Sequence, residues 1–285
     1  MSDKRIPDLW YTEYQTEDLA LGLRIEETLV RETTPYQELM VAKTRSFGNL
    51  LVLDGTVQLT GRDEFFYHEM LVHVPLAAHG TPRRILVIGG GDGGTVREAL
   101  KHPSVEHVDL VEIDARVTEA ARRFFPELAG ALDDPRVTVR HVDGIEFVAQ
   151  SAADSYDAIL VDSTDPVGAA EGLFGPAFYA EAARVVGPDG VLAAQSESPL
   201  LHLDLIRRMA RGMGEAFGHV RLYLSPVPTY PSGLWSFLAA SAHLDVSRPK
   251  ADLPTFRTRY YTPEIHAAAF ALPPFVREGA PEVLV

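Results

Sequence analysis

The chain has no cysteine among its 285 residues, and this absence removes several kinds of chemistry at once. Without thiols it has no disulfide framework, no cysteine nucleophile and no cysteine-bound zinc or iron–sulfur cluster. Long apolar runs are also missing, since no stretch approaches the roughly 18 apolar residues that cross a bilayer. Residues 1–8 are polar and charged rather than an apolar secretory segment, so we expect no signal peptide. The sequence therefore predicts a cytoplasmic protein without a membrane span.

Positive charge is scarce as well. The chain has 26 Lys and Arg against 40 Asp and Glu, which gives a formal net charge of −14. A field of that sign repels a nucleic acid and attracts a small cation. An acidic surface also serves solubility alone, so charge by itself leaves both interpretations open.

Repeats and low-complexity segments are absent, which excludes solenoids and propellers. The first part of the chain instead alternates short apolar runs with turn signals. Asp54-Gly55, a dipeptide favoured in two-residue hairpins, separates the apolar runs 50–53 and 56–60. We predict a small N-terminal antiparallel β-strand domain over residues 1–61, followed by a helix from about residue 62 to 78.

The rest of the chain alternates apolar strand-like runs with helical segments, which predicts a parallel, doubly wound α/β sheet with right-handed crossovers. The alternation ends at residues 220–224 and 234–240, two strand-like runs joined by a proline-containing segment without a helix. A terminal antiparallel hairpin on a Rossmann-like sheet is typical of class I methyltransferase-like folds, so we predict such a catalytic domain over residues 62–285. The expected earlier strands are 85–88, 105–112, 137–142, 156–162 and 190–195.

The first strand of this domain ends in a glycine-rich loop. Gly89, Gly91 and Gly94 fit the pattern G-x-G-x-x-G, and Glu112 lies 18 residues beyond Gly94 at the tip of the next strand. Glycine lets the backbone approach a nucleoside closely, and a carboxylate accepts strong hydrogen bonds from ribose hydroxyls. A glycine loop alone is often only a turn, but this strand, helix and acid together predict nucleoside binding.

Asp92 inside the loop indicates which kind of nucleoside. In an NAD enzyme a pyrophosphate would rest against the helix N-terminus at this place. Two like charges about 4 Å apart cost roughly 4 kcal/mol at an effective dielectric constant near 20, whereas an amine or sulfonium gains from the same carboxylate. The loop therefore favours a cationic adenosine derivative, and the alternative is that Asp92 only caps the following helix.

Two more strands end in acidic residues. Asp143-Gly144 either places a carboxylate beside an adenine amino group or forms a simple Asx turn. Asp162 and Asp165 follow the fourth strand, where Asp-x-x-Asp-Pro alone is often a helix-capping turn. Because ligands of such sheets bind at the carboxyl ends of the strands, we expect both acids and Asp92 to surround one crevice. With no metal-type histidine nearby, such a cluster predicts a polycation, with Mg²⁺ as the alternative.

These motifs together resemble the polyamine aminopropyltransferase family, which includes spermidine synthase, and the resemblance covers nearly the whole chain. Each stretch is short, but the combination is specific. The stretches that carry it are Thr34-Pro35-Tyr36-Gln37, Phe47-Gly48-Asn49, Leu53-Asp54-Gly55, 62–69, 89–94, Glu112-Ile113-Asp114, Asp143-Gly144, 162–166 and Pro228-Thr229-Tyr230-Pro231.

The resemblance implies transfer of an aminopropyl group from decarboxylated S-adenosylmethionine to putrescine, giving spermidine and 5′-methylthioadenosine. It also implies a homodimer or homotetramer with no metal and no cofactor, since the nucleoside is a co-substrate. By matching motif positions, the donor would contact Gln37, Gly89, Gly91, Asp92, Glu112, Asp143, Gly144, Asp162 and Ala169. The polyamine would contact Tyr67, His68, Asp92, Asp162, Ser163, Thr164, Asp165, Gln195 and Tyr230, with Asp162 accepting the proton of the attacking amine.

Two of these assignments stand on the resemblance alone. From the residues, His68 is a solvent-facing helix residue, and Ala169 occupies a position where many relatives have proline. Three alternatives stay open: an S-adenosylmethionine methyltransferase with the same fold, an NAD oxidoreductase, and a non-catalytic polyamine-binding paralogue. The acidic cluster disfavours the methyltransferase, because the amino-acid end of its substrate carries a carboxylate.

Overall fold

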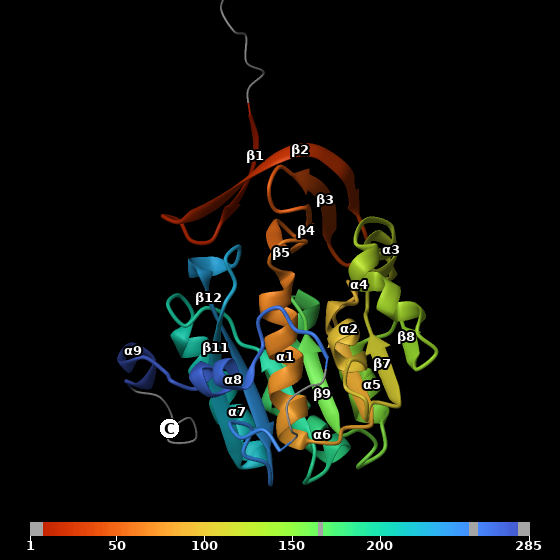
Figure 1. Cartoon of the computed structure of the whole chain (residues 1–285), viewed down its shortest axis with the longest axis vertical. Coiled ribbons are helices and arrows are strands. Elements are labelled where there is room, and N and C mark those ends of the chain that lie inside the picture. Colours follow the sequence, from red (N-terminus) through yellow and green to blue (C-terminus); the bar gives the residue numbers. More distant parts are fainter. Residues whose placement is uncertain (1–7, 165–167, 251–255, 279–285) are drawn as a thin grey trace, which may run out of the picture.

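The computed structural model describes residues 8–164, 168–250 and 256–278 (Figure 1). Asp165 therefore lies outside the described residues, and so does the side chain of Ala169. Two sheets organise the described part of the chain, one of five strands and one of seven. Figure 1 shows the five-stranded sheet arching over one end of the larger domain.

The N-terminal sheet is an antiparallel meander in the order β1-β2-β3-β4-β5, as predicted. Asp54 and Gly55 both have positive φ, 47° and 80°, which confirms the predicted tight hairpin. Strand β1 was not expected from the sequence. The strands are β1 (Leu9–Tyr14), β2 (Ala20–Thr33), β3 (Glu38–Thr44), β4 (Asn49–Leu53) and β5 (Thr56–Thr60).

The larger sheet has the order β11-β12-β10-β9-β6-β7-β8. Strands β10, β9, β6, β7 and β8 are parallel, and the hairpin of β11 and β12 joins antiparallel, which confirms the predicted fold. The strands are β6 (Arg84–Gly89), β7 (His107–Val111), β8 (Val137–Arg140), β9 (Ala158–Asp162), β10 (Val191–Gln195), β11 (His219–Pro226) and β12 (Leu234–Ser241).

Helices cover both faces of this sheet, which explains why its central strands are apolar throughout. In β6, Ile85 and Val87 pack into one core while Leu86 and Ile88 pack into the other. Helices α1 and α2 lie on the first side, and α5, α6 and α7 on the second. These helices are α1 (Glu64–His79), α2 (Gly94–Leu100), α5 (Gly144–Gln150), α6 (Pro176–Val186) and α7 (Leu203–Phe217).

The remaining helices tie the two domains and the C-terminal segment to this frame. Leu39, Leu51 and Leu59 of the N-terminal sheet share a small core with Val117 and Phe125 beside α3 and α4. We keep residue 61 as the proposed domain boundary, since β5 ends and α1 begins on either side of it. These elements are α3 (Ala115–Phe124), α4 (Pro126–Ala129), α8 (Pro263–Ala269), α9 (Pro274–Arg277), and the 3₁₀ turns η1 (Gly130–Asp133), η2 (Gly168–Phe174) and η3 (Pro231–Gly233). Among the described residues, no helix combines the length and apolar character needed to cross a bilayer.

Candidate active site

A cavity of about 400 Å³ lies at the carboxyl ends of β6, β7 and β9, under the N-terminal sheet. Its wall therefore combines residues of both domains. Every predicted site residue whose side chain is described lines it: Gln37, Tyr67, His68, Gly89, Gly91, Asp92, Glu112, Asp143, Gly144, Asp162, Ser163, Thr164, Gln195 and Tyr230. The prediction that the strand ends form one crevice is thus met by Asp92 and Asp162, while Asp165 lies outside the described residues.

The glycine loop brings the backbone of β6 against that of β9. The N–H of Gly90 donates to the carbonyl oxygen of Asp162 over 2.7 Å. Gly89 has φ +77°, and a Cβ at this position would lie 2.1 Å from the same oxygen. At Gly91 a Cβ would lie 2.9 Å from Oε2 of Glu112. Glycine is required here because the loop packs directly against two of the acids that line the cavity.

Glu112 and Gln37 form the edge of the cavity where we expected the ribose. The Glu112 carboxyl group accepts the N–H of Gly91 (3.2 Å) and the N–H of Asp114 (2.9 Å). Burial raises the pKa of Glu112 to about 7. Gln37 is held by Asp114, whose Oδ2 accepts its amide at 2.9 Å. Asp114 is a positioning residue that the sequence analysis missed, although it stands in the motif Glu112-Ile113-Asp114.

Asp143 forms the Asx turn that was the alternative to a ligand contact, and it also lines the cavity. Its Oδ1 accepts the N–H groups of Ile145 (2.7 Å) and Glu146 (3.2 Å), which caps α5. Gly144 is needed because a Cβ there would lie 2.5 Å from Cγ2 of Ile88 in the cavity wall. The cap fixes the carboxyl group of Asp143 at the cavity edge, so the two interpretations are compatible.

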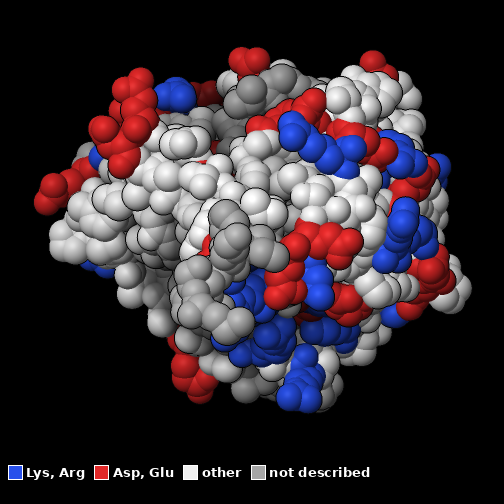
Figure 2. All heavy atoms as spheres, turned by 90° about the horizontal axis from the view of Figure 1, so that it is seen from above, with Lys and Arg blue, Asp and Glu red and all other residues white. Residues whose placement is uncertain are grey.

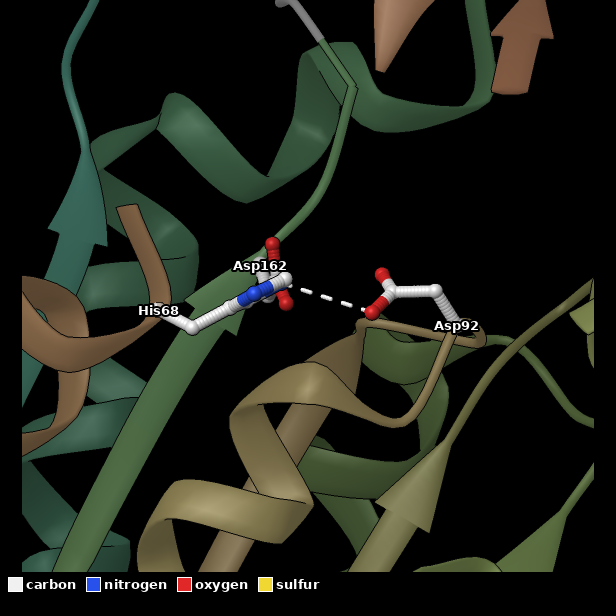
Figure 3. Close-up of side chains that lie close together, drawn as sticks. All are labelled: His68, Asp92 and Asp162. Atoms are coloured by element: carbon white, nitrogen blue, oxygen red, sulfur yellow. Dashed lines mark ion pairs between the residues drawn. The ribbon is translucent and has the colours of Figure 1, made fainter. Parts of the chain in front are cut away.

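The acidic cluster lies at the other end of the cavity. One ligand-type atom each of His68, Asp92 and Asp162 lies within 4.8 Å of the other two (Figure 3). Nε2 of His68 is 3.4 Å from Oδ1 of Asp92, the contact drawn as a dashed line in Figure 3. The same Asp92 oxygen accepts the N–H of Gly94, the first residue of α2, at 2.8 Å, although the N-cap position itself is Gly93 and not Asp92. An arrangement of this size suits a cation such as an ammonium group.

Two expectations about His68 were wrong. From the residues alone we expected it to face solvent and the acidic cluster to lack a histidine, but His68 is 3% exposed and lies within the cluster, at the cavity where the family resemblance placed it. The reason is that α1 is covered on nearly all sides, with Glu64 to Ala78 almost entirely buried. Burial lowers the pKa of His68, but Asp92 and Glu64 outweigh it and hold that pKa well above its ordinary value. The two carboxylates therefore favour the protonated form of His68.

Asp162 is the acid best suited to accept a proton. Burial and then the negative charge of Asp92 raise its pKa, while His68 opposes them. Thr95 donates its hydroxyl to Oδ2 of Asp162 at 2.6 Å, and the buried Tyr67 also lowers the pKa of Asp162. The hydrogen bond from Thr95 fixes the carboxyl group in the cavity wall.

Aromatic rings line the channel beside Asp162. The ring centroid of Tyr230 is 5.6 Å from that of Tyr67 and 4.8 Å from that of Trp235, which the sequence analysis missed. Gln195 donates to the carbonyl oxygen of Ser163 at 3.4 Å. Rings on one wall and polar groups on the other suit a methylene chain that ends in amines.

A Rossmann-like domain with a cavity at the carboxyl ends of its parallel strands, lined by buried acidic groups, defines the class of this protein: an α/β enzyme with a small-molecule site at the strand ends. Comparison with known proteins gives the family. Residues 64–250 match the family described as "Spermine/spermidine synthase domain", and residues 9–61 match "Spermidine synthase tetramerisation domain". The chain belongs to the polyamine aminopropyltransferase family, which confirms the resemblance found in the sequence.

Individual relatives agree with this assignment. The chain is 54% identical over 277 residues to the polyamine aminopropyltransferase of Moorella thermoacetica, covering 96% of this chain and 98% of that protein. It is 50% identical over 275 residues to that of Nitrosococcus oceani, covering 95% and 97%. A crystal structure of spermidine synthase in complex with the transition-state analogue AdoDATO superposes with a TM-score of 0.92 at 36% identity, covering 97% of each chain. Spermidine synthase from Thermotoga maritima gives a TM-score of 0.90 at the same identity and coverage.

Proposed function

We propose that this enzyme transfers the aminopropyl group of decarboxylated S-adenosylmethionine to putrescine, giving spermidine and 5′-methylthioadenosine. The observation that carries the proposal is one cavity with a nucleoside-type edge at Glu112 and a cation-binding cluster at Asp92 and Asp162. The nucleoside would lie along Gln37, Glu112 and Asp143. The ammonium group of its aminopropyl arm would pair with Asp92.

The reaction is an in-line displacement at carbon. The lone pair of the attacking amine forms a bond to the methylene next to the sulfonium, and the carbon–sulfur bond breaks with its electron pair passing to sulfur. The neutral thioether needs no acid to leave. Positioning of the two substrates and delivery of an unprotonated amine are therefore the work of the protein.

Proton removal is the demanding part of this step. An ammonium of pKa about 10.4 that gives its proton to a carboxylate of about 3.9 is uphill by roughly 9 kcal/mol in water. Burial beside Asp92 raises the pKa of Asp162, and a nearby sulfonium lowers the pKa of the amine. Both effects reduce the pKa difference between the ammonium group and the carboxyl group. We propose Asp162 as the proton acceptor for this reason.

Putrescine as the acceptor is supported by the channel. Its ring wall at Tyr67, Tyr230 and Trp235 accommodates a short methylene chain, and Gln195, Ser163 and Thr164 supply polar atoms along it. The loop Thr229-Tyr230-Pro231 resembles that of enzymes that prefer putrescine. Asp165 and Ala169 keep their predicted contacts as part of this proposal.

We further infer that the N-terminal sheet assembles copies of this chain into a dimer or tetramer. Leu9, Trp10 and Tyr14 of β1 are 62%, 58% and 79% exposed, which is unusual for apolar side chains of this size. Figure 2 looks down on this end of the molecule and shows charges of both signs interspersed beside a broad uncharged area. Assembly, a cytoplasmic location and independence of any cofactor or metal remain predictions.

A transfer assay tests the proposed function. The enzyme is incubated with decarboxylated S-adenosylmethionine and putrescine, and both products are quantified by mass spectrometry. We expect equal amounts of spermidine and 5′-methylthioadenosine, and slower reaction with cadaverine, agmatine or spermidine as the acceptor. As a control, S-adenosylmethionine replaces the donor. We expect no S-adenosylhomocysteine, whereas a methyltransferase would produce it. Absence of 5′-methylthioadenosine in the first reaction would refute the proposal.

A further inference from the structure

We propose that Glu64 is a positioning residue that holds a proton on Nδ1 of His68. Nε2 is then the nitrogen that loses its proton when the cationic arm of the donor binds. Binding of the donor at Asp92 then expels one proton from His68. This inference rests on the proposed function, because it takes the donor to be a nucleoside that carries an ammonium group.

Glu64 and His68 lie four residues apart on α1, which places them on the same face of the helix. Oε2 of Glu64 is 2.7 Å from Nδ1 of His68, and both side chains are almost completely buried. A carboxylate at this distance is an acceptor only, so Nδ1 carries the hydrogen. Nε2 is thereby the nitrogen that faces Asp92 and the cavity (Figure 3).

The pair is held rigidly from the other side. Arg97 of α2 grips Glu64 with both terminal nitrogens, at 3.2 Å to Oε1 and 2.8 Å to Oε2. The imidazole of His68 lies flat against Gly94, where a Cβ would come within 2.2 Å of the ring. Glu64 is thus held from behind by Arg97 and the ring of His68 is backed by Gly94, so we expect binding to change the protonation of His68 rather than its position.

The charged groups around His68 explain why such a change follows from binding. His68 faces Glu64 on its own helix, Asp92 in the glycine loop and Asp162 on β9, while Arg97 reaches Glu64 from behind. In the empty site the proton on Nε2 balances Asp92. An ammonium group at Asp92 neutralises that carboxylate in place of the imidazolium, and its positive charge repels the imidazolium. His68 then loses the proton on Nε2, and the neutral ring presents the Nε2 lone pair to the bound cation.

The sign of the pH dependence follows. Burial lowers the pKa of His68, but Asp92 and Glu64 outweigh burial and raise it, so the two carboxylates favour a proton on Nε2 before the donor binds. The bound ammonium lowers that pKa. Affinity for the donor therefore rises with pH between the bound and the free pKa of His68, and is constant outside that window.

Calorimetry in buffers of different ionisation enthalpy counts the protons released on binding. The probes are decarboxylated S-adenosylmethionine without acceptor and 5′-methylthioadenosine, which has the same ribose and base but no cationic arm. Any proton from Glu112 is released with both ligands and cancels in the difference. We expect a difference of about one proton near neutral pH, since a single group titrates.

Variants assign that proton. His68→Gln abolishes the difference, and Glu64→Gln moves the pH window of proton release and of donor affinity about one unit lower, because His68 loses one of its two anionic partners. Glu106→Gln removes a surface carboxylate that pairs with Arg83 and leaves both unchanged. If Glu64→Gln acted only by destabilising α1, donor binding would weaken at every pH and the pH window of proton release would not move.

The titration of His68 by NMR in the unmodified enzyme gives the same answer without a variant. Its Cε1 proton should show a lower pKa with the donor bound than with 5′-methylthioadenosine bound. Equal proton release for the two ligands, an unshifted window in Glu64→Gln, or equal pKa values of His68 in the two complexes would overturn the inference. Failure of the donor to bind or to react with putrescine would instead refute the proposed function.

Discussion

Helix α1 carries two buried histidines, His68 and His73, whose surroundings differ in one respect. Nδ1 of His73 is 3.0 Å from Nε2 of His102, and its Nε2 is 2.9 Å from Oε2 of Glu98. Rings of Phe256 and Tyr261 pack against it, and it does not line the cavity. His68 is equally buried and also pairs with carboxylates, but its second partner, Asp92, faces the cavity.

This difference separates a structural charge network from a functional one. Around His73 every partner is a protein group, and burial, followed by the neighbouring His73, lowers the pKa of His102 to about 3. Such a network is complete without a ligand. Around His68 one carboxylate partner, Asp92, lines the cavity, so the proposed substrate cation would compete with the imidazolium for that carboxylate.

The largest effect on activity is expected at Asp162, which belongs to the cluster around His68 that lines the cavity. Asp162→Asn keeps the shape of the side chain but removes the proton acceptor. We expect turnover to fall at least a hundredfold, with the affinity for 5′-methylthioadenosine nearly unchanged. Steady-state kinetics and calorimetry measure the two quantities. Turnover equal to that of the parent enzyme would remove Asp162 from the role of base.

Substitution at His73 tests the closed network. His73→Phe leaves Glu98 without one partner, although Arg97 and Lys101 still pair with it. We expect the free energy of unfolding to fall by about 2 kcal/mol, as for a buried charged group that loses one hydrogen bond. Urea denaturation at fixed protein concentration measures it. The KM for the donor should be unchanged in the folded variant, and a large increase would show that the two networks are not independent.

Asp92→Asn tests the cation-binding end of the cavity. We expect the affinity for decarboxylated S-adenosylmethionine to fall about tenfold, since a charge-assisted bond becomes a neutral one while the competing His68 cation is also weakened. The affinity for 5′-methylthioadenosine, which lacks the ammonium group, serves as the control and should stay within a factor of two or so. Equal losses for both ligands would mean that Asp92 acts through the loop structure alone.

The smallest effect is expected at the nucleoside edge. Burial raises the pKa of Glu112 to about 7, and ribose hydroxyls that donate to the carboxylate lower it again on binding. The affinity for 5′-methylthioadenosine should therefore rise a few-fold as the pH increases through 7 and level off above it. Glu112→Gln should bind more weakly and show no such rise. A flat profile in the parent enzyme would contradict the contact with ribose.

Most of the fold could be predicted from the sequence because local residue patterns determine most of its strands and turns. Parallel strands buried on both faces read as apolar runs, and Asp54-Gly55 marks a hairpin whatever surrounds it. The edge strand β1 and the short helices α8 and α9 were not predicted, although Thr262-Pro263 at the start of α8 is a local helix-start signal. Their positions depend on contacts made across the folded chain, such as those of the Glu69 carboxyl group with the N–H groups of Tyr260 and Tyr261.

The site divides in the same way. The acids at strand ends could be placed because parallel strands bring their carboxyl ends to one edge. The burial of His68 was missed although apolar residues surround α1 without forming one face, which is typical of a helix covered on all sides; which groups His68 meets there depends on tertiary packing. The pairing of Glu64 with Arg97, 33 residues apart, likewise depends on how α1 packs against α2. Family resemblance supplied His68 and Asp92, but gave no role to Glu64 or Arg97.

A crystal structure of this chain with decarboxylated S-adenosylmethionine and an unreactive diamine analogue tests the account most directly. It should show the ribose hydroxyls on Glu112 and the ammonium nitrogen about 3 Å from a carboxylate oxygen of Asp92. The nearest amine of the analogue should face Asp162. A donor seated with its ammonium group away from Asp92, or a diamine outside the channel between Tyr67 and Tyr230, would contradict it.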